Sequence, residues 1–126
     1  MYGASGKNVS EVSGWLNKNA GETPGFVLIS VASHDAVIFS SGLQMSRFIH
    51  EGDGIYWTLA TKHPNQWARW IVMRNGDDSD QTYRLLHNNP EFLHDYVLIS
   101  NYPFADVYEI KPQYIKDLHT KPFSKT

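Results

Sequence analysis

The chain has 126 residues, of which 41% are apolar, 13% aromatic and 19% charged, with no cysteine and a formal charge of −2 at pH 7. This length suits one hydrophobic core rather than two, so we expect a single α/β domain over residues 1–126. The lack of cysteine excludes disulfides and thiolate zinc sites, and the near-neutral charge argues against nucleic acid as a partner.

The N-terminal third predicts a helix, a buried strand and a second short helix. Apolar residues recur at helical spacing between residues 8 and 20, which indicates an amphipathic helix. Residues 26–32 form a continuous apolar run, which is typical of a strand covered on both faces, so we expect Phe26–Val31 to be the central strand. His34 is expected on the loop that follows, before a helix from about Asp35 to Ser41 that Gly42 closes.

Strands and helices continue to alternate along the rest of the chain. The expected strands are residues 47–50, 70–73, 96–99 and 105–110. One helix contains Ile55 and Leu59 and must stop before Pro64, and another runs through Leu86 and ends near Pro90. A last helical turn is expected over residues 112–119, and a disordered tail over 120–126.

This order of elements predicts an α/β fold. Alternating strands and helices form a three-layer sandwich with a mostly parallel, doubly wound (Rossmann-like) sheet and right-handed crossovers. The sheet should have about five strands. The last two strands are close enough in sequence to form an antiparallel hairpin at the C-terminal edge of the sheet.

Polar side chains follow three of the expected strands, and ligands of open parallel sheets bind beyond the carboxyl ends of the strands. We therefore predict one polar cleft at that edge, which could hold a sugar, a phosphate or a divalent ion. The residues predicted to line it are Asp35, His50, Glu51, Arg74 and Asp78. Helix capping and turn formation also favour such residues at these places, so a purely structural role stays open.

Known catalytic motifs give little support for a complete active site. Asp78–Ser79–Asp80 matches the DxD with which many nucleotide-sugar glycosyltransferases hold a divalent cation, and such a cation is the one cofactor that the sequence suggests. The GxGxxG, GxxxxGK[ST], GxSxG and HExxH patterns are absent. Trp57 and Trp67 could stack on sugar rings, whereas Trp70 within a strand is expected in the core.

Three segments resemble the extracytoplasmic C-terminal domain of membrane glycosyltransferases of the dolichyl-phosphate-mannose-protein mannosyltransferase-like kind. They read SHDAVIFSSGLQMSRFIHEGDGIYW from Ser33 to Trp57, then HPNQWARWIVMRNGDDSDQTYRLL, then YVLISNYPFADVYEI. The resemblance covers about residues 8–110 and consists of apolar blocks with a few polar signatures.

The resemblance implies an accessory domain on the extracytoplasmic side of a membrane, within a longer protein. Its partners would be the transmembrane part of that protein and a glycan, an acceptor or a lipid-phosphate sugar. In this family the catalytic carboxylate belongs to the membrane part, so the isolated chain is expected to be inactive. The chain itself has no apolar stretch near the roughly 20 residues that span a bilayer.

Two other functions remain open from the sequence. One is a small α/β enzyme or nucleotide-binding module whose site is the polar strand-end set. The other is a protein-interaction domain that uses its aromatic side chains as contact anchors.

Overall fold

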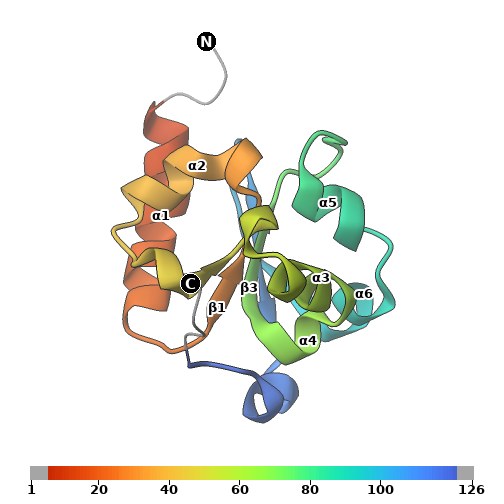
Figure 1. Cartoon of the computed structure of the whole chain (residues 1–126). Coiled ribbons are helices and arrows are strands. Elements are labelled where there is room, and N and C mark those ends of the chain that lie inside the picture. The colour runs from red at the N-terminus through yellow and green to blue at the C-terminus, as the bar shows by residue number, and fades with distance from the viewer. Residues whose placement is uncertain (1–5, 122–126) are drawn as a thin grey trace.

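The computed structural model describes residues 6–121 and has one open sheet of five strands in the order β2-β1-β3-β5-β4 (Figure 1). β1 is parallel to β2 and β3, and β5 is antiparallel to both β3 and β4. The α/β class and the antiparallel C-terminal hairpin are therefore confirmed. The strands are β1 Phe26–Leu28, β2 Phe48–Ile49, β3 Ala68–Met73, β4 Tyr96–Asn101 and β5 Asp106–Ile110.

Helices lie on both sides of this sheet, α1 and α2 on one side and α3 to α6 on the other (Figure 1). The predicted turn at residues 112–119 is present as a 3₁₀ segment, and most of the predicted tail lies outside the described residues. The helices are α1 Gly6–Gly21, α2 Val31–Ser40, α3 Ile55–Lys62, α4 Pro64–Trp67, α5 Gln81–Leu86 and α6 Pro90–Asp95. Three 3₁₀ segments are η1 Met45–Arg47, η2 Glu51–Asp53 and η3 Pro112–Asp117.

Side-chain alternation along the strands produces a core on each face of the sheet. Val27 of β1 belongs to a cluster with α1 and α2, whereas its neighbours Phe26 and Leu28 belong to a cluster with α3, α5 and α6. Trp70 of β3 is 1% exposed, so its predicted place in the core is confirmed. Burial on both faces explains the unbroken apolar run at β1.

β1 lies between β2 and β3 as predicted, but it is shorter than the predicted strand. It ends at Leu28, and Val31 is already the first residue of α2. The reason is Ser30, whose side chain accepts a hydrogen bond from the Ser33 backbone N–H and so caps a helix that the sequence analysis placed four residues later.

The early start of α2 also corrects the expected position of His34. This residue is inside the helix at a kink (φ −134°, ψ 31°) and is 1% exposed, not on an exposed loop. The spacing of His34, Val37 and Ile38 places all three on the buried face of α2. α2 ends as predicted, with Gly42 in the left-handed region (φ 75°) just beyond it.

Two short helices, α4 and α6, were not predicted. Each begins with a proline, Pro64 or Pro90, whereas a proline in the sequence was expected only to end the preceding helix. Proline at the first helical position is favourable because its missing N–H would have no partner there. The side chain of Asn89 caps α6 by accepting from the backbone N–H groups of Glu91 and Phe92.

Candidate functional site

The five residues predicted to line a cleft all lie beyond the C-terminal ends of β1, β2 and β3. His50 and Glu51 directly follow β2, and Arg74 directly follows β3. Asp35 lies in α2, and Asp78 lies in the loop before α5. Within residues 6–121, no hydrogen bond or ion pair joins any two of the five, so the shared cleft stays a prediction.

Glu51 closes the N-terminus of α2. Its Oε1 atom accepts from the Val31 backbone N–H at 2.6 Å, and its Oε2 atom accepts from the Ser30 hydroxyl at 2.5 Å. Burial acts to raise the pKa of Glu51, but hydrogen bonds from Ser30, Val31 and Ala32 outweigh it and hold that pKa below its ordinary value. This carboxylate takes the position at the end of β1 where a helix N-terminus would otherwise attract an anion.

A buried pair, His34 and Asp80, lies near the same sheet edge. His34 Nε2 is 2.7 Å from Asp80 Oδ2, and the two side chains are 1% and 0% exposed. The Asp80 carboxylate also accepts from the backbone N–H groups of Arg74 and Thr82, at 2.8 and 2.9 Å. Asp80 therefore caps α5, closes the loop after β3 and ties both to α2.

The hydrogen bonds of Asp80 argue against the DxD motif as a cation site. Asp80 is buried with both carboxylate oxygens hydrogen-bonded, whereas Asp78 is exposed. The motif thus offers one exposed carboxylate. Across residues 6–121 no group of three His, Asp or Glu side chains is placed to hold a metal ion, and a divalent cation remains a prediction from the sequence.

Arg74 lines a pocket of about 300 Å³ where the β4–β5 hairpin meets the end of β3. Asp106 in this pocket accepts hydrogen bonds from the amides of Asn75, at 2.5 Å, and Asn101. The ring of Phe104, which also lines the pocket, packs edge-on against His34 with ring centres 5.2 Å apart. The two amides of the pocket are thus already bonded to Asp106, and Arg74, which is exposed, also lines the pocket.

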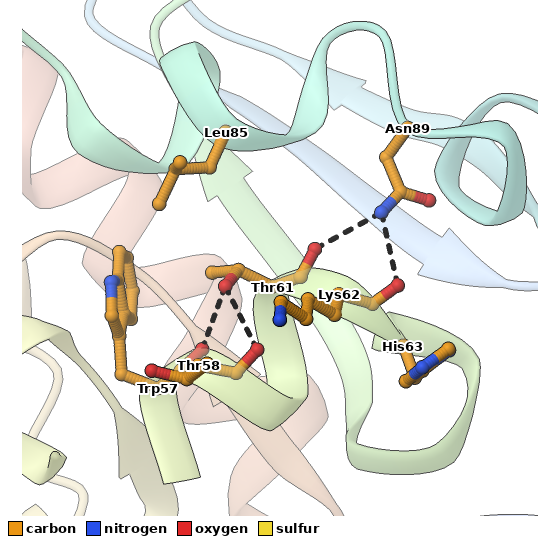
Figure 2. Close-up of a pocket in the computed structure, with 7 residues that line it drawn as sticks. All are labelled: Trp57, Thr58, Thr61, Lys62, His63, Leu85 and Asn89. Atoms are coloured by element: carbon orange, nitrogen blue, oxygen red, sulfur yellow. Dashed lines mark hydrogen bonds between the residues drawn. The ribbon is translucent and has the colours of Figure 1, made fainter. Parts of the chain in front are cut away.

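A larger groove of about 560 Å³ lies between α3 and the α5–α6 segment (Figure 2). Figure 2 shows the Trp57 and Leu85 side chains at one end of the groove, His63 and Asn89 at the other, and Lys62 between them. The remaining lining residues are Thr58 and Thr61. None of the five predicted site residues lines this groove.

The floor of the groove is held by side-chain hydrogen bonds to the backbone. Asn89 Nδ2 donates to the carbonyl oxygens of Thr61 and Lys62, at 3.0 and 3.2 Å, and these carbonyls end α3 (Figure 2). The Thr61 hydroxyl donates to the Trp57 carbonyl at 2.8 Å. Since Asn89 also caps α6, one amide fixes the end of α3 to the start of α6.

The groove combines an apolar wall with positive charge. Trp57 is half-buried and Leu85 is 44% exposed, so both present apolar surface to solvent. Lys62 is exposed, and within the described residues its ammonium has no acidic partner. His63 Nδ1 is 2.8 Å from Glu91 Oε2, so this ring nitrogen already has a partner. Such a groove suits a ligand that has a ring for the indole and an anionic group for the ammonium.

Sequence reasoning singled out Trp57 but missed the rest of the groove. Thr61 is four residues beyond Trp57 and thus on the same side of α3, a spacing that the sequence displays, whereas Lys62 is turned about 140° away around the helix axis. Leu85 and Asn89 could not be added in this way, because only the packing of α5 and α6 against α3 brings them to the groove.

Comparisons of the chain with protein families, curated proteins and solved structures find no match. Within residues 6–121, no helix combines the length and the apolar character needed to cross a membrane. The function must therefore be inferred from the groove and from the polar strand ends.

Proposed function

We propose that this chain is a non-catalytic accessory domain that binds the sugar-phosphate part of a lipid-linked sugar in the Trp57–Lys62 groove. The observation that carries the proposal is the apolar Trp57–Leu85 wall in the same groove as the uncompensated Lys62 ammonium. The face of an indole suits the apolar face of a sugar ring, and a lysine binds phosphate as a point charge.

The accessory role within a membrane glycosyltransferase comes from the sequence resemblance. In this proposal the transmembrane part of the same protein supplies the catalysis, on the extracytoplasmic side of the membrane. Support comes from the strand-end carboxylates of Glu51 and Asp80, which are used to cap helices and close a loop. Carboxylates held in this way contribute to the fold rather than to proton transfer.

The same proposal includes the finer description of the fold as a three-layer, doubly wound sandwich. It is supported by helix-containing cores on both faces of the sheet and by the order β2-β1-β3, in which the chain crosses to either side of β1. On this description the end of β1 is the usual ligand position, and Glu51 already occupies part of it.

Calorimetric titration with mannose 1-phosphate tests the proposed ligand class. We expect Trp57→Ala and Lys62→Gln each to weaken binding about tenfold, since each removes one of the two complementary halves of the groove. Lys18→Gln is the matched control, because Lys18 is an exposed lysine on α1, on the other side of the sheet.

The two halves of the ligand can be tested separately. Methyl mannoside and inorganic phosphate should each bind more weakly than mannose 1-phosphate. If inorganic phosphate bound as tightly as mannose 1-phosphate, Lys62 would act only as a nonspecific cation. Equal losses of affinity in Lys18→Gln and Lys62→Gln would contradict the assigned site. Sugar transfer by the isolated chain would favour a stand-alone enzyme instead.

A further inference from the structure

Asn75 and Gly76 form the middle of a tight turn just after β3. The Arg74 carbonyl oxygen accepts from the Asp77 N–H at 3.2 Å, and Gly76 has a φ of 83°, in the left-handed region that favours glycine. Asn75 and Gly76 are both exposed, and this is the one place in the sequence where glycine follows an asparagine. The turn therefore presents to solvent a side-chain amide beside a backbone N–H that no Cβ shields.

The Gly76 nitrogen is suited to attack the side chain of its own neighbour. Within residues 6–121, the Gly76 N–H has no hydrogen-bond partner that would have to be given up first. Glycine also has no Cβ to hinder the approach of its nitrogen to Asn75 Cγ. Attack at that carbon closes a succinimide ring, which needs no reactant beyond water and hydroxide.

The Asn75 side chain joins the turn to β5. Its Nδ2 atom donates to Asp106 Oδ2 at 2.5 Å and to the Tyr108 hydroxyl at 2.7 Å. Both hydrogens of the amide are thus used. Ring closure needs the side chain to rotate freely, so these two hydrogen bonds oppose the reaction and slow it in the folded chain. They also make Asn75 a link between the turn and the hairpin, in the pocket that both line.

We propose that Asn75 is a site of spontaneous deamidation, and that the reaction breaks the link between the turn and β5. Hydroxide removes the Gly76 amide proton, the nitrogen bonds to Asn75 Cγ, and the side-chain nitrogen takes a proton from water and leaves as ammonia. Water then opens the succinimide at either carbonyl and leaves aspartate or isoaspartate at position 75. The net change is one water consumed and one ammonia released, with no oxidation or reduction.

The product lacks both donors of the link. A carboxylate at position 75 has no N–H to give to Asp106 or Tyr108, and it faces the Asp106 carboxylate, where like charges repel. Isoaspartate also carries the main chain through the side-chain carbon, which disturbs the turn at residues 74–77. Asn101 still donates to Asp106, so the hairpin keeps its own bond while the turn is released from it.

Peptide mapping by mass spectrometry tests the proposal on the whole chain, kept folded in mildly alkaline buffer. We expect position 75 to gain about 1 Da before any other asparagine changes, and to do so faster when the chain is unfolded in urea. Tyr108→Phe removes one acceptor of the Asn75 amide and should speed the reaction in the folded chain about fivefold, the factor that corresponds to one hydrogen bond. Asn75→Gln is the matched control, because its longer side chain does not close the same ring and should show no gain.

A ¹H–¹⁵N spectrum tests the release of the turn. Asn75→Asp, which has the side chain of one product, should shift the amide resonances of residues 74–77, Asp106 and Tyr108. Asn75→Ala loses the same two hydrogen bonds without adding a charge and should shift them less.

Four results would overturn the proposal. They are conversion of another asparagine before position 75, a folded chain that stays unreacted after the unfolded chain has converted, an unchanged rate in Tyr108→Phe, and an Asn75→Asp spectrum that matches the parent at Asp106 and Tyr108. Asn75 does not line the Trp57–Lys62 groove, so these results are independent of ligand binding there.

Discussion

Single carboxylates at the strand ends hold neighbouring elements together. Glu51 bonds the start of α2, and Asp80 bonds the start of α5, the loop after β3 and His34. Because these acceptors face backbone N–H groups and buried side chains, their removal leaves donors without partners. Substitutions at these positions should therefore affect folding stability first, whatever binds nearby.

Glu51 should make folding stability depend on pH in the acidic range. Its pKa in the folded chain is held below the ordinary value of 4.5, so its contribution is present above about that pH and is lost as the pH falls through the folded-state pKa. Glu51→Gln should cost about 1 kcal/mol at pH 7 and progressively less as the pH falls through the folded-state pKa of Glu51. Urea denaturation across this range measures it, with Glu22→Gln, an exposed glutamate, as the control.

Asp80 and Asp78 should differ sharply although they belong to the same three-residue motif. Asp80→Ala removes the cap of α5 and leaves His34 and the Arg74 N–H without their acceptor, so we expect a loss of about 3 kcal/mol in the free energy of unfolding. Asp78→Ala, at an exposed side chain, should change it by less than about 0.5 kcal/mol. Equal effects in urea denaturation would show that the buried pair does not stabilise the loop.

At the scale of secondary structure, apolar patterning predicted most elements but not all boundaries. The run at Phe26–Leu28 and the expected hairpin were identified because burial and turn chemistry leave local signals. The start of α2 was wrong because Ser30, within an apolar run, was not considered as a helix cap. Propensity alone cannot show which of several candidate residues caps α2, because the choice depends on tertiary contacts such as the hydrogen bond from the Val31 N–H to Glu51.

A substitution in β1 tests whether this strand is buried in the core. Leu28 is 0% exposed and lies in the core with α3, α5 and α6. Leu28→Ala should cost about 3 kcal/mol because it removes buried methyl groups and leaves a cavity. Leu93→Ala, at a leucine of α6 that is 63% exposed, is the matched control and should cost much less. A similar loss for both variants in chemical denaturation would contradict the central place of β1.

The candidate site was less accessible to prediction than the fold. The structure has Glu51 and Arg74 just beyond the ends of β2 and β3 and Asp35 inside α2, and their shared cleft stays a prediction. The sequence pattern could not reveal that the Glu51 carboxylate already accepts hydrogen bonds at the start of α2. The groove beside Trp57 depends on the unpredicted helix α6, whose cap Asn89 also holds the end of α3.

For the whole molecule, we expect binding without catalysis. Incubation of the chain with a lipid-phosphate sugar and an acceptor peptide should give no glycosylated product above background. Turnover that Asp78→Ala abolishes would instead support the DxD motif as a cation site. Turnover lost only in Asp80→Ala would need the stability of that variant measured in parallel, because Asp80 is part of the fold.

Chemical-shift mapping with mannose 1-phosphate on the ¹⁵N-labelled chain distinguishes the Trp57–Lys62 groove from the polar strand ends in one spectrum. We expect the shifts to gather on Trp57, Lys62 and Asn89, and Lys62→Gln to need about ten times more ligand to produce them. Shifts confined to the strand-end residues around Glu51 and Arg74, with the groove unmoved, would contradict it.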